Sequence, residues 1–342
     1  MTGQALGRIS LLLLFGLPAA APAQTLRGAG ATFPYPMYQK WFAAFHQRRP
    51  QIDFEYQPVG SSEGIQQLLE KKVDFAASDR PLSDAEMERL PFGVMHLPTL
   101  AGAVVPIYNL GNIVEDLRFP PAALAGIYMG KITRWNDKRI WAANRRVALP
   151  DTAITVVHRA EGSGTTYVLT DYLSKVSPEW KAGVGAGSSV QWPLGQAAES
   201  NEGVAERVRR TPNSIGYVEL IYALQNHLSY GTVQNSAGRF VQANLESVAA
   251  AASSALAVET RPAASDFRLS ITDPPGREAY PIPSFTYLLV PLRGEDAARR
   301  AALIDFLDWM LSFGQRQAAA LGYVPLPEPI LRREREAVLG LR

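Results

Sequence analysis

Four separated segments of the chain have the residue types that hold a small tetrahedral anion. Three of them run into an amphipathic helix pattern, and a helix start offers free backbone N–H groups and a positive dipole end to an anion. The fourth supplies a carboxylate, which an anion site normally avoids. This combination predicts an anion that carries a proton. The segments are Gly28–Pro34 (GAGATFP), Gly60–Gly64 (GSSEG), Ala77–Arg80 (ASDR) and Arg159–Thr165 (RAEGSGT).

The proton prediction depends on Asp79. An ionised carboxylate only accepts hydrogen bonds, so it can accept one from a protonated phosphate oxygen. Sulfate at neutral pH lacks that proton, and its lone pairs would face the carboxylate. Sites built for a ligand hydroxyl disfavour analogues without it by about 10⁴- to 10⁵-fold. Taken alone, Asp79 could equally cap the following helix or pair with Arg80.

The loop at 162–165 (GSGT) is the strongest of the four anion segments. Its glycines permit close backbone approach, while two hydroxyls and successive N–H groups can converge on oxygen atoms. Arg159 lies just before it, where the planar guanidinium could bind two anion oxygens, and Glu161 is its alternative partner. The G-x-x-x-x-G-K-[ST] spacing of a nucleotide-hydrolysing loop is missing from this loop.

Short apolar runs alternate with helical patterns along the chain, which is typical of an α/β protein. The β-branched run at 154–157 precedes the GSGT loop and a helical pattern, giving strand, anion loop and helix in succession. Ser83 and Glu86 form a capping-box pattern, which predicts a helix soon after Asp79. The Ala/Ser-rich stretch 249–256 and the proline-rich stretch 261–283 are weakly patterned and predict surface excursions. The charged tail from Arg332 is expected to be exposed.

Residues 1–23 have the pattern of a cleavable secretory signal. Arg8 precedes an apolar core that ends before Pro18, and Ala21-Pro22-Ala23 fits a cleavage site. The apolar run is shorter than the roughly 20 residues of a membrane span. We therefore expect export to the periplasm and a mature chain that is not inserted in the membrane.

The composition bounds the function further. The chain has 342 residues, of which 47% are hydrophobic and 19% charged, so it is long enough for two globular domains. Cysteine is absent, which excludes disulfides, a cysteine nucleophile and lipid attachment to an N-terminal cysteine. A net charge of +2 does not favour a nucleic-acid-binding surface. The four histidines lack metal-binding spacing, and we expect neither metal nor cofactor.

From about Gly28 to its end, the chain resembles the periplasmic phosphate-binding proteins of Pst-type ABC transporters. The resemblance rests on the ordered motifs GAGATFP, QPVGSSEG, VDFAASDRPLSD, IYMGKITRWND, HRAEGSGTT, GAGSSVQWPLG and NSIGYVE. In two departures, Glu161 stands where an aspartate is expected and Arg80 where a small residue is expected. Glu161 would still orient Arg159, and Arg80 could lower the pKa of Asp79 or raise the local positive potential. The phosphate ligands implied are Thr32, Phe33 through its backbone, Ser61, Asp79, Arg159, Ser163, Gly164 and Thr165.

The resemblance also implies an α/β, type II periplasmic binding protein fold, with the ligand in a cleft between two lobes joined by a two-segment hinge. We expect lobe one at 24–102 and 283–342, and lobe two at 103–282. The protein would be a monomer without enzymatic activity. It would bind inorganic phosphate and deliver it to the permease and ATPase subunits of an ABC transporter.

Three other functions stay open from the sequence. The protein could bind another oxyanion, such as sulfate, molybdate or a phosphonate. It could be a secreted phosphatase or serine hydrolase using Ser163 and His158, although no G-x-S-x-G elbow surrounds this serine. It could also be a scavenger, sensor or adhesin built on the same fold.

Overall fold

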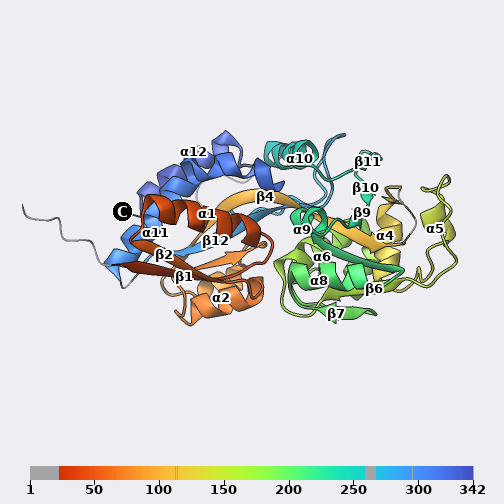
Figure 1. Cartoon of the computed structure of the whole chain (residues 1–342), viewed down its shortest axis with the longest axis horizontal. Helices are drawn as coiled ribbons and strands as arrows, with labels where there is room; N and C mark the ends of the chain where they lie inside the picture. Colours follow the sequence, from red (N-terminus) through yellow and green to blue (C-terminus); the bar gives the residue numbers. More distant parts are fainter. Residues whose placement is uncertain (1–22, 112, 114, 259–266, 295, 342) are drawn as a thin grey trace, which may run out of the picture.

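The computed structural model describes residues 23–111, 113, 115–258, 267–294 and 296–341, in two lobes that lie side by side (Figure 1). All but the last residue of the expected leader, 1–23, lies outside the described residues. One mixed sheet runs through both lobes in the order β2-β1-β3-β12-β4-β8-β6-β7, and β9 pairs with β4. The predicted α/β class is confirmed.

The first lobe contains the left part of this sheet in Figure 1. β1, β2 and β3 are parallel, while β12 runs antiparallel to β3 and β4. Its strands are β1 (Gln24–Gly30), β2 (Ile52–Gln57), β3 (Phe75–Ser78), β12 (Pro283–Pro291) and the first part of β4 (Val94–Asn109). Its helices are α1 (Tyr35–Arg48), α2 (Ser61–Leu69), α3 (Asp84–Glu88), α11 (Ala297–Ser312), η1 (Gly314–Gln317), η2 (Ala319–Leu321) and α12 (Glu328–Leu339).

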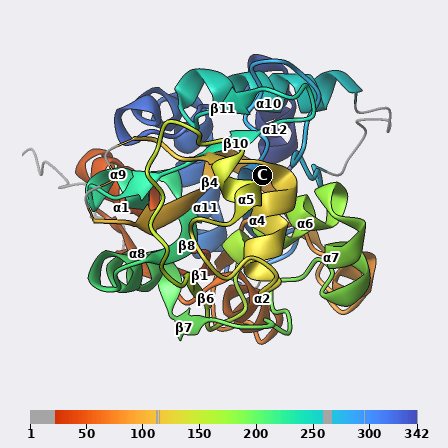
Figure 2. The same cartoon turned by 90° about the vertical axis from the view of Figure 1, so that its right-hand side faces the viewer.

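In the second lobe, β8 lies antiparallel to β4 and parallel to β6, and β6 is parallel to β7. Figure 2 shows α6 and α8 on opposite sides of these strands. The main strands are β6 (Thr155–Arg159), β7 (Gln196–Ala198), β8 (Ser214–Glu219) and β9 (Ser229–Tyr230), and a small sheet contains β5 (Arg118–Phe119), β10 (Thr232–Gln234) and β11 (Phe240–Val241). The helices are α4 (Pro121–Tyr128), α5 (Lys138–Trp141), α6 (Gly164–Val176), α7 (Pro178–Gly183), α8 (Ser200–Arg210), α9 (Leu220–Gln225) and α10 (Leu245–Val258).

The long strand β4 connects the two lobes. Residues 94–103 pair with β12, and residues 104–109 pair with β8. At the change of partner, the Val104 N–H donates to the Ile282 carbonyl at 2.9 Å. Two chain segments, near residues 103–104 and 282–283, therefore cross between the lobes side by side.

The carboxyl ends of β1, β3 and β6 lead into the anion segments. Ligand sites of α/β proteins form at such strand ends, because the following loops and helix starts gather there. The helix pattern that follows the Gly28–Pro34 segment is confirmed as α1, in which Tyr38, Trp41, Phe42 and Phe45 are buried. The capping box is confirmed as well. Ser83 is the N-cap of α3, which begins at Asp84, and its side chain accepts from the Glu86 N–H while the Glu86 side chain accepts from the Ser83 N–H.

Two expectations about the C-terminal third are wrong. The stretch 249–256 lies within α10, since alanine is the best helix former and Val248, Ala251 and Ala252 are buried. The tail forms α12, in which Ile330, Leu331, Glu334 and Val338 are buried. The described part of 261–283 lacks helix or strand before β12, and its residues 275–278 are exposed as expected, whereas Tyr280 and Ile282 are buried.

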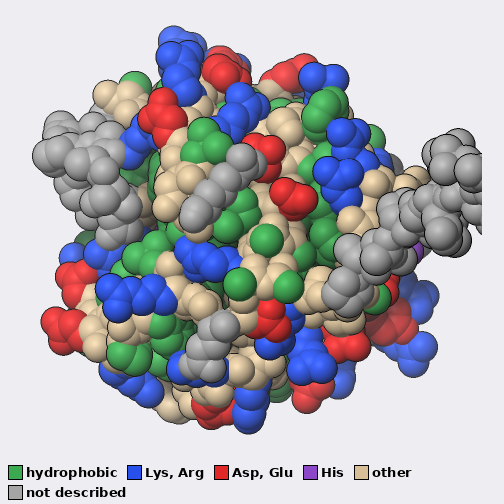
Figure 3. Space-filling model, turned by 90° about the vertical axis from the view of Figure 1, so that its left-hand side faces the viewer, with side chains coloured by type: hydrophobic (Ala, Val, Ile, Leu, Met, Phe, Trp, Pro, Cys, Tyr) green, Lys and Arg blue, Asp and Glu red, His purple; other side chains and the backbone are tan. Residues whose placement is uncertain are grey.

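Charges of both signs are mixed on the end of the first lobe. Figure 3 shows Lys and Arg side chains next to Asp and Glu over this face. The face in Figure 3 therefore lacks the uniformly basic charge of a nucleic-acid-binding surface. No helix of the described residues is both long and apolar enough to span a membrane.

We predict that Gly64→Ala destabilises the first lobe. An added Cβ would lie 2.4 Å from the Gly30 Cα and 2.6 Å from the Ala29 carbonyl oxygen, and these backbone atoms have no room to move. Overpacking of this kind costs about 1–3 kcal/mol in the free energy of unfolding, which urea titration measures. Gly183→Ala is the control, because its Cβ meets nothing within 4 Å and should stabilise α7 by about 0.4–1 kcal/mol. Equal stability of the two variants would contradict the close packing of α2 on β1.

Candidate anion-binding site

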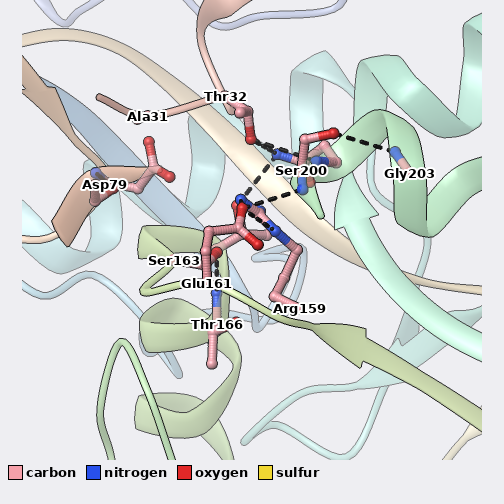
Figure 4. A network of polar contacts seen from close by, with 12 residues as sticks. Ala31, Thr32, Asp79, Arg159, Glu161, Ser163, Thr166, Ser200 and Gly203 are labelled. Carbon is pink, nitrogen blue, oxygen red and sulfur yellow. Dashed lines mark hydrogen bonds and ion pairs between the residues drawn. The ribbon is translucent and has the colours of Figure 1, made fainter. Parts of the chain in front are cut away.

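The structure brings the four sequence segments together between the lobes. The Ser62 N–H donates to the Gly162 carbonyl at 3.1 Å, and a Cβ on Gly164 would lie 2.4 Å from the Ser61 Oγ. A side chain at position 164 would therefore displace Ser61 or Asp79 of the first lobe. The predicted ligand residues are all buried: Thr32, Phe33, Ser61, Asp79, Arg159, Ser163, Gly164 and Thr165. Figure 4 shows Thr32 and Asp79 facing Arg159 and Ser163.

Two helix starts converge at this place. α2 begins at Ser61 without a side-chain cap, and α6 begins at Gly164 with Ser163 as its N-cap. The Ser163 Oγ accepts from the Thr166 N–H at 3.1 Å, so its hydroxyl hydrogen stays available for another acceptor. Their N–H groups and dipoles create positive potential where the lobes meet, as an anion site requires.

Asp79, which comes directly after β3, is held by residues of β12, the neighbouring strand in the sheet. Thr286 donates to the Asp79 Oδ1 at 2.9 Å, and Ser284 donates to the Asp79 carbonyl at 3.1 Å. The Asp79 N–H donates to the Ser61 Oγ at 3.3 Å. The sequence reasoning did not include Ser284 and Thr286, although hydroxyls two residues apart in a strand share one face.

Burial raises the pKa of Asp79 from 3.8 to about 7, although Thr286, Arg159 and Thr165 act in the opposite direction. Desolvation disfavours the charged carboxylate, and the hydrogen bonds and the cation recover only part of that cost. Asp79 therefore takes up or releases a proton near neutral pH. In this environment the carboxyl is matched to a ligand that itself carries an exchangeable proton.

Arg159 is fixed by Glu161, as the resemblance implies. Its Nε donates to the Glu161 Oε1 at 2.9 Å, and its Nη2 bonds to the same oxygen. Partial burial raises the pKa of Glu161, but the hydrogen bonds from Arg159 outweigh this and hold it below its usual value. The Ser200 N–H also donates to this oxygen at 3.1 Å. The longer glutamate therefore still holds the guanidinium, with Nη1 directed toward the Thr165 Oγ1 at 3.4 Å.

Arg80 has another role than the sequence hypothesis gives it. Its guanidinium forms two hydrogen bonds with Glu86, at 2.8 and 2.6 Å, and Arg80 holds the pKa of Glu86 down at about 2. The cation that lowers the pKa of Asp79 is Arg159. The Arg80 Nε instead donates to the Ser188 Oγ in the second lobe at 2.7 Å, and the Ser188 carbonyl accepts from the Ser163 N–H at 2.9 Å. Arg80 thus links the first lobe to the GSGT loop.

Tyrosines orient the peptide groups of the first segment. Tyr222 donates to the Thr32 carbonyl and Tyr323 to the Phe33 carbonyl, each at 2.6 Å. A trans peptide places its N–H opposite its C=O, so the Phe33 N–H is directed away from Tyr222. Sequence reasoning missed both tyrosines, since they lie about 190 and 290 residues farther along the chain.

Hydrolase and metal chemistry find no support in the described residues. His158 Nδ1 bonds to the Arg159 carbonyl, and its ring stacks on Trp192 at 5.0 Å between centroids. Neighbouring residues of a strand point to opposite faces, so His158 points away from the side of β6 that carries Arg159. Among the described residues, no three His, Cys, Asp or Glu side chains are grouped so that they could hold a metal ion.

Comparisons with known proteins agree on one family. A family model described as the PBP superfamily domain matches residues 18–313. The phosphate-binding protein PstS of Xylella fastidiosa (strain Temecula1) is 45% identical over 319 residues, 92% of this chain and 86% of that protein. PstS of Pasteurella multocida (strain Pm70) is 41% identical over 334 residues, covering 97% and 94%. The solved structure of a phosphate-binding protein from Stenotrophomonas maltophilia has a TM-score of 0.69 at 22% identity, covering 92% and 94%.

We predict that Asp79→Asn removes a pH dependence of stability. The pKa of Asp79 is higher in the folded chain, so ionisation weakens folding, and stability is lost as the pH rises from about 4 to about 7. Relative to the parent, the free energy of unfolding of the asparagine variant should rise by about 1.4 kcal/mol for each pH unit in this window. Urea unfolding of phosphate-free protein at several pH values measures the difference. Parallel curves for parent and variant would contradict the raised pKa.

Proposed function

Because the chain belongs to the PBP superfamily, and within it to the PstS phosphate-binding proteins, we propose that it binds inorganic phosphate for import by an ABC transporter. The two-lobed α/β fold of this family, predicted from the sequence, is confirmed. The observation that carries the proposal is one buried carboxyl, Asp79, in a site otherwise made of donors. Phosphate at neutral pH offers both the acceptors and the proton that such a site matches.

The ligand contacts are assigned by chemistry. Arg159 supplies the cation, and the hydroxyls of Thr32, Ser61, Ser163 and Thr165 donate to phosphate oxygens. Backbone N–H groups at Phe33 and Gly164 add donors from a loop and from the start of α6. Asp79 accepts the proton of the ligand. These fixed dipoles replace the water that phosphate loses, and that loss is costly without them.

The proposed ligand residues come from both lobes, and closure of the lobes on the anion follows from this. Thr32, Ser61 and Asp79 belong to the first lobe, while Arg159 and the GSGT loop belong to the second. Only a closed arrangement brings both sets to one anion, so phosphate favours that arrangement by its differential affinity. The crossing segments near residues 103 and 283 would form the hinge, with lobe one at 24–102 and 283–342 and lobe two at 103–282.

The remaining parts of the proposal concern the cellular setting. The leader pattern of residues 1–23 supports export to the periplasm, where the protein would act as a monomer that is not inserted in the membrane. The closed protein would dock on a permease and release phosphate to it, with ATPase subunits driving transport. No chemical step is assigned to the protein, and His158 is bonded and stacked away from Ser163.

Another oxyanion is the main competing ligand. Sulfate and molybdate carry no proton at neutral pH, so both would leave their lone pairs against Asp79. Arsenate has the same protonation pattern as phosphate and is expected to compete with it. The discrimination therefore depends on proton content rather than on size.

We predict that calorimetric titration of phosphate-stripped protein gives saturable binding of phosphate and no binding heat with sulfate. Asp79→Asn should weaken phosphate binding by about 10- to 100-fold and reduce the discrimination, because a hydrogen bond to a charged group is lost. Asp74→Asn is a control, since that carboxylate bonds to the Arg27 N–H and pairs with Arg299 outside the site. Absence of phosphate binding by folded, ligand-free parent protein would contradict the proposed function.

We predict that the contact between Arg80 and Ser188 slows phosphate release. Arg80→Ala and Ser188→Ala each remove the same hydrogen bond between the lobes and should raise the dissociation constant about 3- to 10-fold. The double variant should resemble either single variant, as expected for a coupled pair. The salt dependence of binding should not change in Ser188→Ala, because that variant keeps the ion pair between Arg80 and Glu86. Additive effects, or a changed salt dependence in Ser188→Ala, would contradict this assignment.

A further inference from the structure

Asn201 is a buried residue at the start of α8 that contacts predicted ligand residues of both lobes. Its Nδ2 donates to the Thr32 Oγ1 at 2.8 Å and to the Thr165 Oγ1 at 3.3 Å. Figure 4 shows Thr32 opposite this helix start, next to Ser200. One carboxamide therefore joins the two threonine hydroxyls that come from different lobes.

The orientation of this carboxamide is fixed by a second contact. Its Oδ1 accepts from the Glu219 N–H at 3.0 Å, at the end of β8. A backbone N–H can only donate, so the oxygen of the amide must face Glu219. The NH₂ group consequently faces the two threonines.

A count of lone pairs shows what this does to the hydroxyls. Each hydroxyl has one hydrogen and two acceptor lone pairs. The Thr32 Oγ1 accepts from the Asn201 Nδ2 and from the Asn201 N–H at 3.4 Å. The Thr165 Oγ1 accepts from the Asn201 Nδ2 and from the Arg159 Nη1 at 3.4 Å. With both lone pairs engaged, each hydroxyl can only donate.

The Thr165 hydroxyl lies close to Asp79, because its hydrogen bond lowers the pKa of that carboxyl, and an anion bound between the lobes would accept the single Thr165 hydrogen in place of Asp79. Asp79 is on the side on which the two lobes meet at Gly164. We propose that Asn201 is a positioning residue that determines specificity, by making Thr32 and Thr165 obligate donors to the anion. The inference rests on the proposed function and deepens it.

The consequence is a preference for the form of phosphate with one proton. Two threonines that can only donate cannot accept a hydrogen from the ligand, and Asp79 provides the acceptor for one ligand proton. A doubly protonated phosphate would place a second hydrogen against a donor and leave it unsatisfied. Asn201, without touching the ligand, therefore selects HPO₄²⁻ over H₂PO₄⁻.

The test is Asn201→Asp, which keeps the shape and replaces the donor by an acceptor. The threonine hydroxyls would turn toward the new carboxylate and present lone pairs to the ligand. Phosphate affinity at pH 8 should fall at least about 100-fold. At pH 5.5 the difference in phosphate affinity between variant and parent should narrow to about 10-fold or less. At that pH the new carboxyl is protonated and again offers a donor, and the ligand carries two protons. Calorimetric titration at both pH values measures this.

A second variant and a control separate positioning from folding. Asn201→Ala leaves the hydroxyls free to rotate and should cost about 10-fold at both pH values, without the pH-dependent gap. Asn235→Asp makes the same chemical change at another buried asparagine, whose Nδ2 donates to the carbonyls of Gly276, Arg277 and Ala279. It should lower the free energy of unfolding in urea and leave phosphate affinity unchanged.

The outcomes are distinct. Parent-like affinity of both Asn201 variants overturns the inference while the proposed function stands. An equal loss for Asp and Ala at both pH values also overturns it, because packing alone then explains the residue. If Asn201→Asp does not fold, parent-like binding by Asn201→Ala overturns the inference, and a loss in that variant with normal stability supports it. A parent that binds no phosphate contradicts the proposed function instead.

Discussion

The structure depends on the burial of one carboxyl, Asp79, beside hydroxyl groups and the cation Arg159. A buried charge is costly unless it is paired or hydrogen-bonded, and burial raises the pKa of Asp79 to about 7 even against the opposing effects of Thr286, Arg159 and Thr165. The fold compensates through Thr286, Arg159 and Thr165, which come from both lobes. The site is therefore completed only by bringing distant chain segments together.

The sheet provides that assembly. β12 carries Thr286 and also lies beside β4 where the chain crosses between the lobes. The strand that supports the carboxyl is thus one of the two connections between the lobes. A change in the angle between the lobes would move the GSGT loop and Arg159 relative to Asp79, while Asp79 keeps its own support. Ligand binding can then be linked to closure without loss of the buried hydrogen bonds of the first lobe.

The sequence predicts those parts of the site whose residues lie together in the chain. Each anion segment combines its strand end, loop and helix start within about ten residues, so local patterns suffice. Supports such as Thr286, Tyr222 and Asn201 are distant in sequence, and their partners follow only from the topology. The errors at α10 and α12 have other causes. The alanine-rich α10 gives a weak hydrophobic pattern. In α12 the apolar face of Ile330, Leu331 and Val338 is present at helical spacing, but the many charges of the segment masked it. Burial of Glu334 in α12 illustrates this, since a glutamate would normally indicate an exposed position.

The charges around the site are largely balanced before any ligand is considered. Arg159 is paired with Glu161 and Arg80 with Glu86, and burial raises the pKa of Glu219 well above its usual range, which keeps it neutral. Net charge then contributes little to the binding of the anion, and fixed dipoles of hydroxyls, N–H groups and helix starts contribute most. Such dipoles recognise where a ligand has lone pairs and where it has hydrogens. Two dianions of similar size, phosphate and sulfate, differ in this pattern and in little else, so a balanced site can distinguish them where a strongly cationic one could not.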